Sequence, residues 1–202
     1  MIKISIKSDI EKALKRLDDV QKKQVPFATA KALTETAREV QRAMPNQVER
    51  DFDQPIGFTK RGFYVVSAKK SDLKAIVGIK DIQAKYLGLQ VSGGTARPKK
   101  RALLSPAGVN LNRYGNMTRN KVKQLLAMPD VFSGTVRGIA GIWQYQGKAG
   151  KPGRKLKLLI RYKDAQEYRP RFKFYDTAEA IARASFSRNF NAALSAALRT
   201  AR

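Results

Sequence analysis

Two different hydrophobic periods follow one another at the start of the chain. Ile2, Ile4 and Ile6 alternate with polar residues, which predicts a half-buried β-strand. Residues 8–11 (Ser-Asp-Ile-Glu) then have the spacing of a helix-capping box. The apolar residues that follow recur at helical spacing and predict a helix to about Gln24: Ile10, Ala13, Leu14, Leu17 and Val20.

A second helix is predicted from Pro26 to Met44. Proline is favoured in the first turn of a helix, where its missing N–H is not needed. Pro45 is expected to end this helix. The predicted apolar stripe consists of Phe27, Ala30, Leu33, Ala37, Val40 and Met44.

The middle of the chain has the pattern of β-hairpins. Residues 61–68 and 73–80 are rich in β-forming residues and predict one hairpin, and residues 138–146 and 156–163 predict another. Between the hairpins, a Gly-, Pro- and Arg-rich region over residues 88–118 is expected to form a long loop. It leads into a short helix predicted over residues 118–128.

The chain ends in a predicted helix over residues 176–199. Its apolar stripe is dominated by small residues, which permit close packing against another element. A core role is the favoured interpretation of this stripe; the alternative is a subunit interface carried by Phe186, Phe190, Leu194 and Leu198. The predicted fold class is therefore α+β: an antiparallel β-sheet flanked by N-terminal helices and a long C-terminal helix. We expect a single domain over 1–202, with basic loop excursions at about 88–118 and 147–155.

Composition narrows the possible chemistry. The 202 residues include 41 Lys and Arg against 16 Asp and Glu, a formal net charge of +25, and neither Cys nor His. A thiol nucleophile, a Ser-His-Asp relay and a thiolate or imidazole metal site are therefore excluded. We expect a binding or structural protein rather than an enzyme, with no cofactor, no metal, no signal peptide and no membrane partner.

The excess charge is concentrated in one part of the sequence. Residues 1–81 hold 11 of the 16 acids, whereas residues 82–163 hold only Asp130 against 17 Lys and Arg. Flexible basic loops can contact a phosphate backbone or an acidic protein without reading a base sequence. The candidate DNA- or partner-facing residues are Arg97, Lys99, Lys100, Arg101, Arg113, Arg119, Lys148, Lys151, Arg154 and Lys155.

Three local patterns carry weaker chemical hypotheses. Glu49, Asp51 and Asp53 could hold Mg²⁺ in a nuclease, although a solvated loop is the favoured interpretation. Residues 141–149 fail as a phosphate-binding loop, because five residues separate the glycines and an Ala replaces the Ser or Thr. Trp143, the single tryptophan, is expected in the core rather than stacked on a base.

The order of several short segments resembles a protein family of tailed-bacteriophage virions. The segments are Val25-Pro26-Phe27-Ala28, Phe58-Thr59-Lys60-Arg61-Gly62, Lys85-Tyr86-Leu87-Gly88, Tyr114-Gly115-Asn116-Met117, Gly141-Ile142-Trp143-Gln144, and the helix that carries Phe186, Phe190, Leu194 and Leu198. Together they resemble the minor tail protein Z, or tail-completion, family of long-tailed phages.

The resemblance implies a non-enzymatic subunit near the head–tail junction of a virion assembled in the host cytoplasm. Its partners would be other tail and neck proteins, further copies in a homo-oligomeric ring expected to be a hexamer, and genomic DNA passing through the lumen. Two alternatives stay open from the residues alone. One is a soluble basic nucleic-acid-binding protein of ribosomal or nucleoid type, and the other is the Mg²⁺-dependent nuclease.

Overall fold

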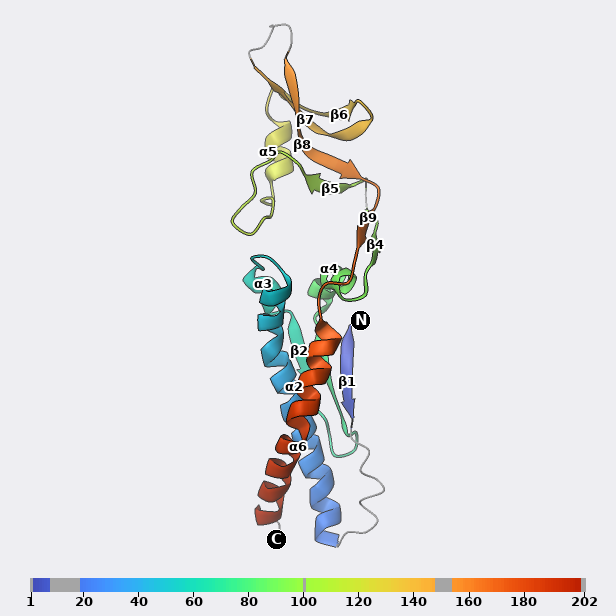
Figure 1. Ribbon diagram of the computed structural model, residues 1–202, viewed down its shortest axis with the longest axis vertical. Coiled ribbons are helices and arrows are strands. Elements are labelled where there is room, and N and C mark those ends of the chain that lie inside the picture. Colours follow the sequence, from blue (N-terminus) through green and yellow to red (C-terminus); the bar gives the residue numbers. More distant parts are fainter. Residues whose placement is uncertain (1, 8–18, 100, 148–153, 201–202) are drawn as a thin grey trace. The chain divides into compact units, whose positions relative to one another are not determined.

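The computed structural model describes residues 2–7, 19–99, 101–147 and 154–200 (Figure 1). Its elements are β1 (Lys3–Lys7), α2 (Asp19–Asp51), α3 (Gly57–Lys60), β2 (Phe63–Val66), β3 (Lys74–Ile79), α4 (Asp81–Ser92), β4 (Gly94–Ala96), β5 (Leu103–Pro106), α5 (Lys121–Leu126), β6 (Val131–Val136), β7 (Ile139–Gln146), β8 (Lys155–Lys163), β9 (Gln166–Tyr168) and α6 (Phe174–Thr200). The predicted α+β class, with antiparallel sheets and a long C-terminal helix, is confirmed. The predicted capping box at residues 8–11 lies outside the described residues.

The chain divides into two compact units where the sequence suggested one domain with loop excursions. Unit 1 consists of Met1–Ser92 and Pro170–Arg202, and unit 2 consists of Gly93–Arg169. The expected loop over residues 88–118 contains the end of α4 and the strands β4 and β5. Because these strands pair with β9 and β8, they belong to the folded body of unit 2 rather than to an excursion, and the end of α4 belongs to unit 1.

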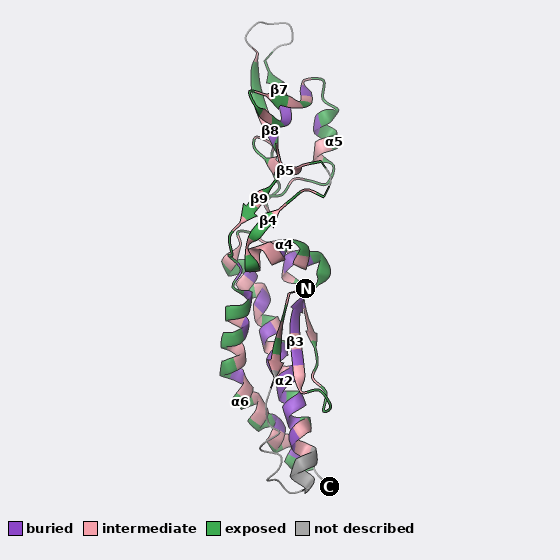
Figure 2. Ribbon diagram, turned by 90° about the vertical axis from the view of Figure 1, so that its right-hand side faces the viewer, coloured by how far each residue is buried: buried purple, intermediate pink, exposed green. Residues whose placement is uncertain are grey.

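Unit 1 is built on a three-stranded antiparallel sheet in the order β1-β3-β2. Val77 of β3 lies opposite Ile4 of β1 and Val65 of β2, so the predicted N-terminal strand and first hairpin join one sheet. Alternation buries Ala75, Val77 and Ile79 in a core shared with α2. Figure 2 shows this burial along β3 and α2, while much of the outer surface of α6 is exposed.

Helix α2 continues through Pro26 and Pro45. This corrects the prediction of one helix to about Gln24 and a second helix that begins at Pro26 and is ended by Pro45. Proline inside a helix removes one backbone hydrogen bond and costs about 3 kcal/mol. Val40, Met44 and Val48 around Pro45 are all fully buried. Burial of each such side chain contributes about 1.5–3 kcal/mol, so tertiary packing outweighs the local cost. Phe27 departs from the predicted stripe: it is 40% exposed, and Lys70 Nζ lies 5.0 Å from its ring centroid.

The small-residue stripe of α6 packs against α2 in the region where their sequences are richest in alanine. Ala28 and Ala32 of α2 form a buried cluster with Ala193 and Ala197 of α6. Alanines let two helix backbones approach closely without cavities. Of the four residues proposed for a subunit interface, Phe186, Phe190 and Leu194 pack against this cluster, whereas Leu198 is 42% exposed.

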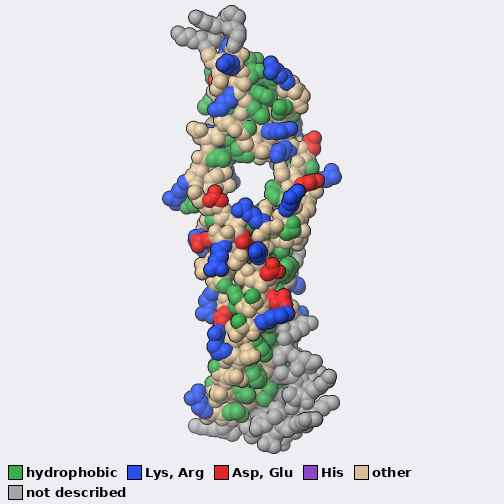
Figure 3. Space-filling model, in the orientation of Figure 1, with side chains coloured by type: hydrophobic (Ala, Val, Ile, Leu, Met, Phe, Trp, Pro, Cys, Tyr) green, Lys and Arg blue, Asp and Glu red, His purple; other side chains and the backbone are tan. Residues whose placement is uncertain are grey.

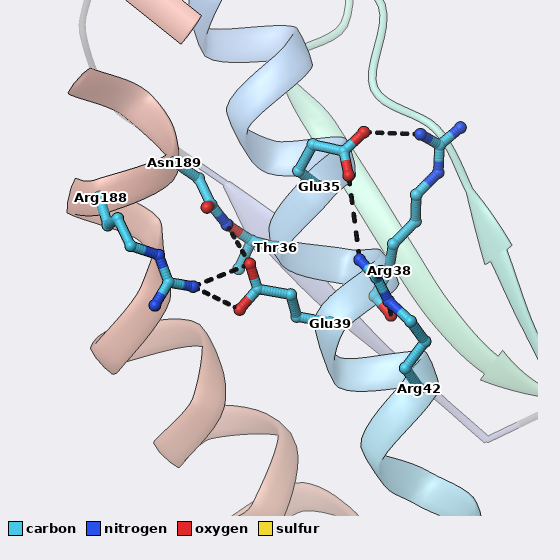
Figure 4. A network of polar contacts seen from close by, with 7 residues as sticks. All are labelled: Glu35, Thr36, Arg38, Glu39, Arg42, Arg188 and Asn189. Carbon is cyan, nitrogen blue, oxygen red and sulfur yellow. Dashed lines mark hydrogen bonds and ion pairs between the residues drawn. The ribbon is translucent and has the colours of Figure 1, made fainter. Parts of the chain in front are cut away.

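A polar network fixes the register of α6 on α2 (Figure 4). Arg188 donates to both carboxylate oxygens of Glu39, at 2.9 and 2.8 Å. Asn189 Nδ2 donates to Glu39 Oε1 at 3.0 Å and to the hydroxyl of the buried Thr36 at 3.1 Å. Partial burial alone would raise the pKa of Glu39, but the hydrogen bonds from Asn189 and Arg188 and the charge of Arg188 hold that pKa below 4.5.

Unit 2 is a four-stranded antiparallel sheet in the order β5-β8-β7-β6, together with the two-stranded sheet β4-β9. The predicted second hairpin is confirmed as β7 and β8, and the predicted short helix as α5. Leu125 of α5 packs with Ile142 and Ile160 in a small core on one face of the sheet. The sequence analysis missed β6, which pairs with β7 along its whole length.

We expect Glu39→Gln to lower the free energy of unfolding by about 1 kcal/mol at neutral pH, because it weakens charge-assisted hydrogen bonds in a partly solvated site. A depressed carboxylate pKa contributes stability above the unfolded value near 4.5 and loses it as the pH falls through the folded value. Urea denaturation should therefore show the stabilities of the two proteins converging as the pH falls below 4.5 through the lowered pKa of Glu39. Glu179→Gln, in the exposed pair with Arg183, should change little at either pH; an equal effect there would contradict the role given to Glu39.

We expect Gly141→Ala to destabilise unit 2 by about 1–3 kcal/mol. A Cβ at this position of β7 would press against the backbone carbonyl of Ile160 and lie 2.8 Å from Leu158 Cδ1. Gly134 is its register partner on β6, and a Cβ there would meet only the Phe132 ring at an ordinary 3.5 Å. Denaturation followed by the fluorescence of Trp143 reports on unit 2; equal stability losses for Gly141→Ala and Gly134→Ala would refute the steric explanation.

Candidate anionic-partner surface

The two units differ in how their charges are neutralised. Unit 1 contains every ion pair found among the described residues, including Lys60–Glu49 at 2.6 Å and Arg188–Glu39 at 2.8 Å. Unit 2 has 17 Lys and Arg against 3 Asp and Glu. Its Asp130 accepts a hydrogen bond from Gln144 at 2.8 Å. Within the described part of unit 2, the basic side chains therefore keep their full charge for an external partner.

The predicted basic residues lie on several separate segments of unit 2. Six of them are exposed: Arg97, Lys99, Arg101, Arg113, Arg119 and Lys155. Arg154, immediately before β8, is half-buried. Lys100, Lys148 and Lys151 lie outside the described residues. On the face drawn in Figure 3, Lys and Arg side chains are dispersed with hydrophobic side chains between them.

Arg154 is held by an aromatic side chain. Its guanidinium carbon lies 4.6 Å from the ring centroid of Tyr145. The Tyr145 ring in turn packs on Phe132, with the centroids 5.1 Å apart. A guanidinium over an aromatic ring gains electrostatic attraction while its N–H groups remain directed sideways. The sheet thus places a cation at a defined position beside apolar surface.

These residues belong to one face of the four-stranded sheet, which we call the aromatic face. Trp143 lies opposite Phe132 on β6 and Leu158 on β8, and Tyr145 lies opposite Leu156. Residues two apart along a strand share a face, so these five side chains project from the same side. Ile142 projects from the other side, into the core with α5. The aromatic face is defined by Phe132, Trp143, Tyr145, Leu156 and Leu158.

Two polar atoms at the aromatic face have no hydrogen-bond partner in the described structure: Trp143 Nε1 and Arg154 Nε. Trp143 is 8% exposed, in agreement with its predicted buried position. Tyr145 is 39% exposed. Buried donors are normally satisfied, and exceptions often mark a functional site.

Arg154, Trp143 and the strand that carries Tyr145 were predicted from the sequence, but Phe132 and the contact of Arg154 with Tyr145 were not. Phe132 was overlooked because Gly134 interrupts the β-rich run at 131–136 and masked the strand. The alternation of Phe132 and Val136 with polar residues was the available signal. The contact of Arg154 with Tyr145 joins β7 to the segment before β8, and only the hairpin register reveals it.

A second stacked pair lies in the segment between β5 and α5. The Arg113 guanidinium carbon is 4.7 Å from the Tyr114 ring centroid. The side chain of Asn112 accepts hydrogen bonds from the backbone N–H groups of Tyr114 and Asn116, both at 3.0 Å. Val109 and Met117 of this segment pack on the α5 side of the sheet. This pair therefore belongs to a segment anchored on the opposite side from the aromatic face.

Two of the three acids considered for Mg²⁺ binding have other partners. Glu49 forms the ion pair with Lys60, and Asp51 Oδ2 accepts a hydrogen bond from the backbone N–H of Lys173 at 2.9 Å. Lys173 directly precedes α6, so Asp51 supplies a capping acceptor and a favourable charge at that helix N-terminus. The described residues contain no group of three acids placed to hold a metal ion.

Comparisons with known proteins add no relative: no protein-family model, no curated protein and no solved structure matches this chain. Among the described helices, none is both long and apolar enough to cross a bilayer.

We expect Asp51→Ala to lower the free energy of unfolding by about 1 kcal/mol through loss of the α6 cap. Asp53→Ala, at an exposed neighbouring position, should stay within about 0.5 kcal/mol of the parent. Chemical denaturation measures both variants. A supercoiled-plasmid assay with Mg²⁺ tests the nuclease alternative: nicking by the parent that disappears in Asp51→Ala would establish it and contradict a purely structural role.

Proposed function

We propose that the protein is a non-enzymatic structural component of a tailed-phage virion: a tail-completion or neck subunit at the head–tail junction. The observation that carries the proposal is the unpaired positive charge of unit 2, 17 Lys and Arg against 3 acids with no ion pair among its described residues. Such a surface requires an anionic partner, and packaged DNA or an acidic neighbouring ring supplies one.

Two of the segments that carry the family resemblance, residues 58–62 and 85–88, have structural contacts, as expected for an assembly component. Thr59 and Tyr86, from two different segments, share a hydrogen bond of 3.0 Å between their hydroxyl groups. Gln83 Nε2 donates to the backbone carbonyl of Phe58 at 3.1 Å. Gly62 packs so closely on Gln83 that a Cβ would lie 2.7 Å from its Cγ. These contacts support a role of the segments in shaping unit 1.

Because their surfaces differ, the two units would have different roles in such an assembly. Unit 1 has an extensive core and forms all the ion pairs found among the described residues, which suits the body of a ring. Unit 2 would face DNA or an acidic neighbour. In a ring of six copies, the formal charge would be roughly +150, so that assembly would depend on neutralisation by polyanion or acidic protein.

The second candidate function is a soluble nucleic-acid-binding protein of ribosomal or nucleoid type. The aromatic face favours it, because arginine beside half-exposed aromatic surface can contact both phosphates and bases. The two candidates differ in where the protein works: the first acts inside a particle and the second acts on free nucleic acid.

Deletion of the gene from the replicon that encodes it should yield filled heads and complete tails that remain unjoined or fail to deliver DNA. Negative-stain electron microscopy of the lysate and titration of infectious particles measure this. A plasmid copy should restore joining, whereas a copy with Arg154→Gln and Arg161→Gln in unit 2 should restore it poorly. Arg42→Gln with Arg183→Gln, two exposed arginines of unit 1, is the matched control. Normal infectivity of the deletion would overturn the proposal.

A further inference from the structure

The aromatic face is the less covered side of the four-stranded sheet. Leu125 of α5 packs with Ile142 and Ile160 on the opposite side, so α5 does not cover this face; Trp143 at its centre is buried, and the face is exposed at its edge. Tyr145 is 39% exposed and Leu156 is 36% exposed. A monomer of this size normally turns apolar sheet surface toward its core, and an exception marks an interaction site.

A strip without side chains runs beside the aromatic residues. Gly134 of β6 and Gly141 of β7 are partners in register, next to the Phe132–Trp143 pair. Neighbouring side chains cover both positions: Leu158 Cδ1 lies 2.8 Å from a Cβ position at Gly141, and the Phe132 ring lies 3.5 Å from one at Gly134. Arg161 lies opposite Gly141 on β8 and is exposed. The face therefore combines an apolar aromatic area with a cation at each of two positions, Arg154 and Arg161.

The mixture of groups distinguishes between the possible anionic partners. Duplex DNA presents phosphates on its outside and hides the faces of its bases, so it would leave the apolar part of the surface exposed. An acidic protein segment offers carboxylates, but planar apolar groups only where aromatic residues happen to alternate with its acids. A single strand offers phosphates and unstacked bases in alternation, which matches aromatic surface flanked by arginines.

We propose that the aromatic face binds a single strand of nucleic acid. Bases pack on the exposed parts of Phe132, Tyr145 and Leu156, while Arg154 and Arg161 contact phosphates. The guanidinium of Arg154 is already positioned by Tyr145, so little side-chain freedom is lost on binding. The Trp143 and Arg154 donors that lack partners lie at this same face. This inference does not rest on the virion proposal and can hold or fail independently of it.

Trp143 is the single tryptophan of the chain and lies on the aromatic face, so its fluorescence reports binding to the full-length protein. An oligothymidylate of about twenty nucleotides should change the emission saturably. A duplex of equal length and a polyglutamate of equal charge should bind at least about ten-fold more weakly. Equal binding of the duplex or polyglutamate, or no change in Trp143 emission on binding of the single strand, would overturn the proposal.

Two matched pairs of variants locate the site. Tyr145→Ala should weaken binding of the oligothymidylate about ten-fold, whereas Tyr114→Ala, which removes the other arginine-stacked tyrosine, should have little effect. Arg154→Gln should reduce the slope of log affinity against log salt by about 0.7, and Arg113→Gln should reduce it less. Equal effects within each pair would show binding by net charge alone and contradict the assignment.

A third variant tests the site without removing an aromatic ring. Leu156→Glu places a carboxylate on the half-exposed edge of the face, opposite Tyr145, without deleting core volume. It should repel phosphate and weaken binding at least about ten-fold. Leu126→Glu, on α5, introduces the same charge at an exposed leucine away from the face and is its control. Circular dichroism of each variant separates lost binding from lost folding, and a folded Leu156→Glu protein with unchanged affinity would refute the proposal.

Discussion

Burial of α2 on two sides is the constraint on which unit 1 depends. One side covers the sheet through Leu33, Val40 and Met44, and the other receives α6 through Ala28 and Ala32. Polar residues within so buried a helix require internal partners. Thr29 and Thr34 each donate to the carbonyl four residues earlier, at 2.8 Å, which satisfies their hydroxyl groups without water. The same two-sided packing lets the helix tolerate Pro26 and Pro45.

The sequence predicted those elements whose signal is local and periodic. The alternation of Ile2, Ile4 and Ile6 gave the edge strand, and the small-residue stripe of residues 176–199 gave α6. The helix end predicted at Pro45 was wrong because that prediction considered only the backbone hydrogen bond that proline removes. Tertiary packing outweighs this local cost, since Val40, Met44 and Val48 are fully buried. Helix α4 was missed because Gly88 and the glycines after it suggested a loop. In the structure Gly88 packs close to β1, where a Cβ at this position would lie 3.2 Å from Ile2 Cδ1.

Of the candidate site in unit 2, only the excess of positive charge was predictable from the sequence. Counting Lys and Arg identified the basic region, but a count does not reveal which cations are neutralised. That depends on where the acids lie: Glu39 and Glu49 pair within unit 1, and Asp130 of unit 2 pairs with an amide. The contact of Arg154 with Tyr145 required the register of β7 on β8, which includes an irregularity between Ile142 and Trp143 that no alternation pattern predicts.

Unpaired positive charge and exposed apolar surface each raise the free energy of unit 2, and one class of ligand would relieve both. Unpaired positive charges repel one another most strongly when the chain is compact. Exposed parts of Tyr145 and Leu156 leave apolar area in water, at about 25 cal/mol for each Å². Salt would reduce the repulsion but leave the apolar area exposed to water. A second apolar sheet face would cover that area but, if it came from another copy of this chain, would double the charge. A nucleic-acid strand supplies negative charge and flat apolar surface together, so its binding would stabilise unit 2 on both accounts.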